Sequence, residues 1–280
     1  MRVDKDITEW FRTTTGVRQG CILSPQLFNV LLELVISLAI QDLDTGIKIQ
    51  GKTLNNLRFA DDIVLMADSE EDLQTLVTLV HTQSKKFGLT INKEKTEVQI
   101  INKVSHPMTI FIGSDQLKQV QTFTYLGGVI TENSTSTEDI KRRIGLAMGS
   151  MQKLSTIWKS KEISTDTKME LYQVLTLSIA TYGSEAWTLK KRDEKRLLVF
   201  EMSCLRWIMG VSRRDRLRNT SIRETTNSQV TIIDKIKAKQ LFYFGHIVRM
   251  PKDRYPKLAL EGRIPGHRPR GRPQNAGLTT

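Results

Sequence analysis

The chain has 280 residues, of which 39% are hydrophobic and 26% charged, and only two cysteines, Cys21 and Cys204. It lacks the ~18-residue apolar run that a membrane span needs, so no membrane partner is expected, and two cysteines exclude a disulfide framework or a four-ligand zinc site. The net charge of +12 is concentrated between Lys235 and Arg272, where 11 Lys or Arg stand against 2 acids. This distribution predicts a nucleic-acid partner, with a solvated basic tail as the alternative.

The first 131 residues mix expected strands with two expected helices. Ser24 and Pro25 predict a helix start, and apolar residues at helical spacing carry it to about Ile40. Ser69, with Asp72 three residues on, predicts the start of a second helix. Short strands are expected at residues 46–51, 54–60, 62–67, 89–92, 97–101, 108–113 and 123–130.

From Ser136 the pattern becomes helical. Ser136 and Asp139 resemble another capping box, and further helices are expected around 165–179, 192–209 and 231–244. Beyond Pro251 the chain is rich in Pro, Gly and Arg, which favours loop or disorder. We interpret three tryptophans as core residues rather than base-stacking platforms: Trp158, Trp187 and Trp207. The expected fold class is α+β.

The stretch LRFADDIVLMAD places two adjacent carboxylates, Asp61 and Asp62, between two β-type segments. A tight hairpin turn would put both at its tip, where their charges reach solvent or a metal. Hard oxygen ligands with no nearby His or Cys favour Mg²⁺ or Mn²⁺. The alternative is a turn with two solvated acids.

Four sequence blocks favour the metal site over the solvated turn. In chain order they are GVRQGCILSPQLFN at 16–29, FADD at 59–62, FGLTINKEKTEV at 87–98 and YLGG at 125–128. Together they resemble the palm of reverse transcriptases from non-LTR retrotransposons, and later stretches are similar to the region after the polymerase domain. The resemblance implies RNA-directed DNA synthesis inside the cell, nuclear or cytoplasmic, with an RNA template, a DNA primer and dNTPs as partners. It also implies a partial palm at 1–135, built as an antiparallel sheet with two helices. A helical thumb-like region at 136–210 and a basic C-terminal region at 211–280 would follow.

The resemblance assigns roles to single residues. Asp61 would ligate Mg²⁺ or Mn²⁺ with Asp62 beside it, and Phe59 would support their turn. Gln19 and Gly20 would lie beside the incoming nucleotide and the templating base. The remaining roles are a lysine near the triphosphate, Lys95 with Lys93 as its rival, and a primer grip formed by Tyr125, Leu126, Gly127 and Gly128. The alternatives are ordinary glycine turns and solvated side chains.

Two features depart from the family pattern. Two metals ~3.5–4 Å apart need carboxylates from more than one segment, and the acids before Gly16 are Asp4, Asp6 and Glu9. Their segment looks like the one just before the RQG block and not like the family's first catalytic block. We therefore expect an incomplete two-metal site, without the first catalytic aspartate and the fingers, and an inactive isolated chain. The alternatives are a non-catalytic nucleic-acid-binding protein derived from a retroelement and a relic without function.

The tail RPRGRP resembles an AT-hook core. Its cations, Arg268, Arg270 and Arg272, can enter a narrow A·T minor groove, where the potential is most negative. A solvated basic tail is again the alternative.

Overall fold

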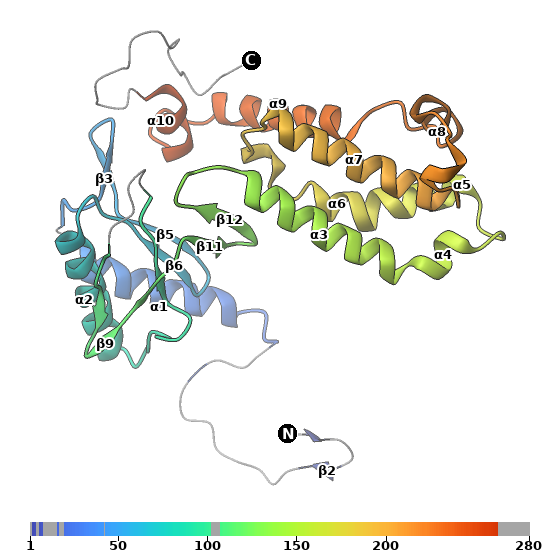
Figure 1. The fold of residues 1–280 in the computed structure, drawn as a ribbon. Coiled ribbons are helices and arrows are strands. Elements are labelled where there is room, and N and C mark those ends of the chain that lie inside the picture. Colours follow the sequence, from blue (N-terminus) through green and yellow to red (C-terminus); the bar gives the residue numbers. More distant parts are fainter. Residues whose placement is uncertain are drawn as a thin grey trace. The chain divides into compact units, whose positions relative to one another are not determined.

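The computed structural model describes residues 2–3, 6–7, 16, 20–41, 43–101 and 107–262, and divides the chain into two compact units. Unit 1 comprises residues 1–97 and 108–118, and unit 2 comprises residues 98–107 and 119–280. Figure 1 shows strands and helices together in unit 1 and mostly helices in unit 2. The predicted α+β class is confirmed.

Unit 1 contains short strands and two long helices. Its elements are β1 Arg2–Val3, β2 Asp6–Ile7, α1 Ser24–Ile40, β3 Ile47–Ile49, β4 Lys52–Leu54, β5 Asn56–Phe59, β6 Asp62–Leu65, α2 Glu70–Lys86, β8 Phe111–Ile112 and β9 Asp115–Gln116. Two further strands lie at the division between the units, β7 Glu97–Val98 and β10 Lys118–Gln119. The described strands pair only two by two, so the single antiparallel sheet that we expected is not formed among them.

The helices α1 and α2 form the core of unit 1. Leu32, Ile36, Ile40, Leu76 and Val80 are buried between them, and side chains of β6 pack against this cluster. Part of the apolar surface of α1 faces solvent, because Leu27, Val30 and Leu38 remain 59%, 69% and 51% exposed.

The second predicted helix start is confirmed, and one predicted strand is absent. The Ser69 side chain accepts a hydrogen bond from the Asp72 amide at 3.1 Å, so Ser69 caps α2 as the sequence predicts. Residues 89–92 do not form the expected strand. The segment leads into a turn in which the Asn92 side chain accepts hydrogen bonds from the Glu94 and Lys95 amides, both at 3.1 Å.

Unit 2 is a hairpin followed by helices. Its elements are β11 Thr122–Tyr125, β12 Gly128–Thr131, α3 Thr137–Lys153, α4 Ser155–Lys159, α5 Thr165–Leu171, the π-helix η1 Tyr172–Leu177, α6 Ser178–Ala180, the 3₁₀ helices η2 Ser184–Ala186 and η3 Arg213–Asp215, α7 Lys191–Ile208, α8 Asn219–Thr225, α9 Ile232–Val248 and α10 Tyr255–Glu261. No described helix is long and apolar enough to cross a membrane.

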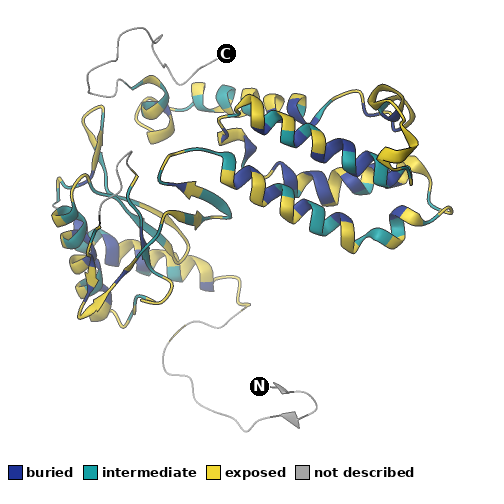
Figure 2. Ribbon diagram, viewed as in Figure 1, coloured by how far each residue is buried: buried dark blue, intermediate teal, exposed yellow. Residues whose placement is uncertain are grey.

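One apolar cluster holds the unit 2 helices together, and Figure 2 shows the buried positions on their inner faces. Trp158 and Trp187 are buried in this cluster and Trp207 packs against it, so the core interpretation of the three tryptophans is confirmed. The helix α10 corrects the prediction of loop or disorder beyond Pro251 for Tyr255–Glu261, whereas residues 263–280 lie outside the described residues and there it stays a prediction. This helix packs on α9, where the buried Lys257 donates a hydrogen bond to the Val248 carbonyl at 2.8 Å.

Candidate active site

The adjacent carboxylates lie on the β5–β6 hairpin of unit 1. Phe59 pairs with Asp62 across the hairpin, so Ala60 and Asp61 form a two-residue turn. This is the tight turn that the sequence predicts, with Asp61 at its tip and Asp62 as the first residue of β6. Both carboxylates are exposed. Ala60 has a φ of 51°, a left-handed conformation that costs a residue with a Cβ of order 1 kcal/mol or more.

The base of this hairpin is anchored to the core of unit 1. Ile63 and Leu65 of β6 pack against the α1–α2 cluster. Arg58 of β5 forms an ion pair with Glu33 of α1 at 2.7 Å. Apolar packing and an ion pair therefore hold both strands, and the two acids project from a fixed support.

The other expected unit 1 site residues are exposed side chains or turns. Phe59 is 62% exposed, so its ring does not pack in the core. Gly20 is exposed with a φ of 83°. Lys95 is exposed on the Asn92 turn, whereas its rival Lys93 pairs with Asp115. Gln19 lies outside the described residues. The structure thus places Gly20, Phe59, Asp61, Asp62 and Lys95 in one unit.

The YLGG stretch forms a second two-residue turn, in unit 2. Tyr125 pairs with Gly128, and the two residues between them, Leu126 and Gly127, have φ angles of 46° and 78°. Positive φ at both positions defines the type I′ turn, the usual connection of a tight hairpin. Glycine suits the second position because it has no Cβ.

Three side chains hold this turn, two from α3 and one from the segment between α6 and η2. Arg142 of α3 donates a hydrogen bond to the Gly127 carbonyl at 2.8 Å, and Arg143 donates to the same oxygen. The Tyr182 hydroxyl donates to the Leu126 carbonyl at 3.0 Å. The Arg143 guanidinium also lies 4.2 Å from the centre of the Tyr182 ring, a cation–π distance. We call Arg142, Arg143 and Tyr182 the turn clamp.

The predicted capping box at Ser136 and Asp139 is not formed, because both side chains have other partners. The buried Asp139 carboxylate accepts hydrogen bonds from the Val129 amide at 3.1 Å and the Trp187 indole at 2.8 Å. The Ser136 hydroxyl accepts from the Thr188 amide at 2.9 Å. Asp139 therefore joins β12 to the helical core.

No sequence motif predicts the turn clamp. Arg142 and Arg143 lie 15 and 16 residues from Gly127, and Tyr182 lies 56 residues from Leu126. Two adjacent arginines in an amphipathic helix carry no local signal for a partner at such separations.

The donor atoms at the β5–β6 turn suit a hard divalent cation. Asp61 and Asp62 offer exposed carboxylate oxygens, and neither forms an ion pair with another described residue. Within the described part of the chain, no group of three or more His, Cys, Asp or Glu could hold a metal ion. Two carboxylates can contribute to a Mg²⁺ site, but Mg²⁺ keeps several waters when protein ligands are this few.

The known proteins that resemble this chain belong to reverse transcriptases and transposon-derived proteins. The family described as reverse transcriptase (RNA-dependent DNA polymerase) matches residues 1–130. A transposon-derived protein of Caenorhabditis elegans is 29% identical over 227 residues, which cover 77% of this chain and 79% of that protein.

Two Pol polyproteins of R2 retrotransposable elements also match. The Nasonia vitripennis polyprotein is 28% identical over 168 residues, or 55% of this chain and 16% of the polyprotein. The Drosophila melanogaster polyprotein is 30% identical over 130 residues, or 43% of this chain and 12% of the polyprotein. The matched segments are thus a small share of these polyproteins. Residues 1–130 are a reverse transcriptase domain, and the chain is a distant homologue of the R2 non-LTR retrotransposon Pol polyproteins.

Proposed function

We propose that the chain is the palm and thumb portion of an RNA-directed DNA polymerase, with Asp61 as its metal ligand and Asp62 as the neighbouring acid. The observation that carries this proposal is the Ala60–Asp61 turn, which presents two exposed carboxylates from a hairpin anchored to the core. The domain match over the same residues supports it. The template is RNA, the primer is DNA and the substrates are dNTPs.

The remaining roles follow the same assignment. Gly20 and Gln19 lie beside the nucleotide and the templating base, and Phe59 shields one side of the turn. Lys95 is favoured over Lys93 as the lysine near the triphosphate, because Asp115 already neutralises Lys93. Tyr125, Leu126, Gly127 and Gly128 form the primer grip.

The metal is Mg²⁺ or Mn²⁺, held by Asp61 and Asp62. When bound, such an ion neutralises charge on the reacting phosphates and orients them for in-line displacement. The chain's own contribution is to hold the two carboxylates on a rigid turn and to bring the Lys95 ammonium to the departing pyrophosphate, where it offsets negative charge. Because two ions need carboxylates from more than one segment, we propose that this site is incomplete and that the 280-residue chain alone does not extend a primer.

Metal binding at the turn is the direct test. Mn²⁺ should selectively broaden the amide NMR signals of residues 60–63 at millimolar concentration, because a bound paramagnetic ion relaxes nearby nuclei. Asp61→Asn should abolish the broadening, whereas Asp68→Asn, which removes another exposed acid of the same unit, should not. Equal broadening in both variants would contradict the metal-ligand role.

Stability and synthesis complete the test. Asp61→Asn should leave the melting temperature unchanged or raise it, because it removes repulsion between exposed neighbouring carboxylates. A lower melting temperature would make Asp61 a structural residue. In a primer-extension assay on an RNA template with Mg²⁺ or Mn²⁺, the wild-type chain should give no product. Extension that Asp61→Asn abolishes would show that the site is complete.

A second candidate is a non-catalytic nucleic-acid-binding protein derived from a retroelement. The exposed cations on and after α9 favour it: Lys237, Arg249, Lys252 and Arg254 are all exposed. Nucleic-acid binding without any metal effect at the Asp61 turn would support this second candidate.

A further inference from the structure

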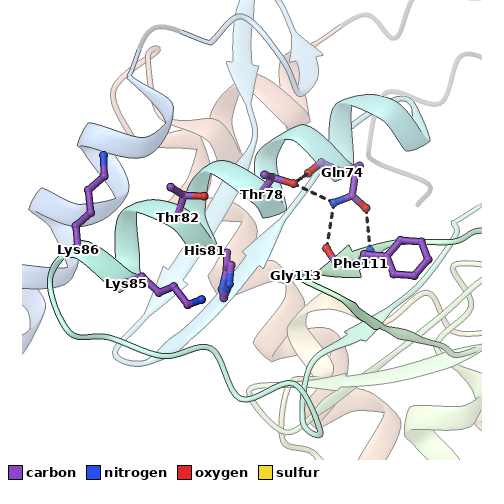
Figure 3. A pocket seen from close by; sticks show the side chains of 8 residues that line it. All are labelled: Gln74, Thr78, His81, Thr82, Lys85, Lys86, Phe111 and Gly113. Carbon is purple, nitrogen blue, oxygen red and sulfur yellow. Dashed lines mark hydrogen bonds between the residues drawn. The ribbon is translucent and has the colours of Figure 1, made fainter.

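A cavity of about 490 Å³ lies between one face of α2 and the strand β8 in unit 1 (Figure 3). Six of its lining residues lie on α2, namely Gln74, Thr78, His81, Thr82, Lys85 and Lys86. The other two, Phe111 and Gly113, belong to β8 and the turn after it. The Asp61 turn contributes nothing to this lining.

The walls of the cavity are fixed by a paired amide contact. The Gln74 side chain donates to the Phe111 carbonyl at 3.0 Å and accepts from the Phe111 amide at 2.8 Å. The Gln74 side chain thus satisfies both backbone groups of Phe111, as a neighbouring strand would. One helical turn earlier in α2, the Glu70 carboxylate accepts a hydrogen bond from the Thr109 amide at 2.7 Å. These bonds hold β8 against α2, so the cavity is already formed.

The lining is cationic and contains no acid. In Figure 3 the Lys85 side chain runs toward the His81 ring, whereas Lys86 extends away from it. The His81 Nδ1 atom is buried and has no hydrogen-bond partner among the described residues. Burial, then the charges of Lys85 and Lys93, lower the pKa of His81. Lys93, whose charge contributes to this shift, forms an ion pair with Asp115 of β9.

A cluster of cations without an acid in the lining carries mutual repulsion. This repulsion falls if an anion enters the cavity, since the anion offsets the lysine charge and can accept a hydrogen bond from a protonated imidazole.

We propose that the α2–β8 cavity binds a phosphate group, with Lys85 as the counter-charge and His81 as the hydrogen-bond donor. The Thr82 hydroxyl adds a neutral donor on the same face. The phosphate comes either from a nucleic-acid backbone or from a free phosphate compound. This site is independent of the catalytic proposal, because no residue of the Asp61 turn takes part.

The experiment follows the four imidazoles of the full chain by NMR, with the His81 signal assigned by its loss in His81→Gln. Its midpoint pH is measured in phosphate-free buffer, with inorganic phosphate, and with a blunt RNA duplex lacking terminal phosphates. The bound anion favours the protonated ring, so the midpoint of His81 should rise with at least one probe.

Two matched variants test specificity. Lys85→Gln should weaken phosphate binding roughly threefold to tenfold, the range for one partly exposed charge. Lys153→Gln removes an exposed lysine from the last turn of another 17-residue helix, α3, and should leave binding unchanged. Both lysines are exposed, so the fold should survive.

The outcomes separate the sources. A rise with the duplex at lower concentration than with inorganic phosphate identifies a nucleic-acid backbone, and a rise with inorganic phosphate alone identifies a free phosphate compound. An unmoved His81 with both probes would overturn the proposal. Equal weakening by the Lys85 and Lys153 variants would do the same.

Discussion

At the scale of single residues, environment separates two side chains of the same type. Cys21 is exposed, and hydrogen bonds from the Leu23 amide, and from the Ser24 side chain and amide, lower the pKa of its thiol. Cys204 is 0% exposed in the core of unit 2. Burial, with the Glu201 charge, raises the pKa of that thiol to about 12. The thiolate is the reactive form, so the two cysteines differ both in access and in the direction in which their thiol pKa is shifted.

This difference predicts ordered alkylation. Iodoacetamide at pH 8 should modify Cys21 in the folded chain and leave Cys204 untouched until denaturant unfolds unit 2, as measured by intact mass and peptide mapping. The Cys21→Ser variant, which keeps only the buried thiol, should stay unmodified under native conditions. Comparable labelling of both cysteines in the folded chain would contradict the buried position of Cys204.

At the scale of elements, hydrogen bonds join the β11–β12 hairpin and the turn clamp into one structural unit. The carbonyls of the turn are oriented by Arg142, Arg143 and Tyr182, and Asp139 fixes the adjacent strand. The turn is therefore fastened to α3 and to the segment around Tyr182.

Paired glycine substitutions test this structural unit. Gly127→Ala should destabilise unit 2 by about 1–3 kcal/mol, because Gly127 has a φ of 78° and an added Cβ would meet Arg143 Nη2 at 3.0 Å. Gly128→Ala is the control, since its Cβ would meet only the Tyr125 carbonyl at 3.6 Å. Chemical denaturation of both variants measures the difference. Equal stabilities would show that the turn tolerates a side chain and that the clamp does not constrain it.

Local signals in the sequence predicted these elements, and distant partners decided the rest. The Asp61 hairpin and the Ser69 cap depend on residues within a few positions, and both are present. Asp139 has the spacing of a capping box, yet it bonds Trp187, 48 residues away. Strand pairing also depends on distant segments, and the described strands form separate two-stranded pairs in place of the single sheet that we expected.

At the scale of the whole molecule, positive charge gathers toward the C-terminal part. The described cations extend through α9 and α10, and residues 263–280 add four arginines and no acid. The proposed AT-hook cations, Arg268, Arg270 and Arg272, lie outside the described residues and stay a prediction. Because α10 packs on α9 through Lys257, a truncation after Gly262 removes residues 263–280 and keeps both helices.

Truncation after Gly262 should reduce the salt dependence of nucleic-acid binding. Each lost phosphate contact lowers the log–log slope by about 0.9 on duplex DNA, so losing four arginines should lower it by about 2–4. Fluorescence anisotropy between 50 and 200 mM salt measures the slope. An unchanged slope would place the contacts on the helices, and the variant Arg249→Gln/Lys252→Gln/Arg254→Gln would then be the one to flatten it.

The division of the chain into two units affects the order in which it can fold on the ribosome. Unit 1 is discontinuous in sequence: it comprises residues 1–97 and 108–118, and residues 98–107 between them belong to unit 2. The two hydrogen bonds of the Gln74 side chain can therefore form only after Phe111 has been synthesised. A nascent chain that ends at residue 97 lacks β8 and leaves the outer face of α2 uncovered. Unit 1 should become resistant to protease only after residue 118 has left the exit tunnel, by which time the first residues of unit 2 have also been synthesised.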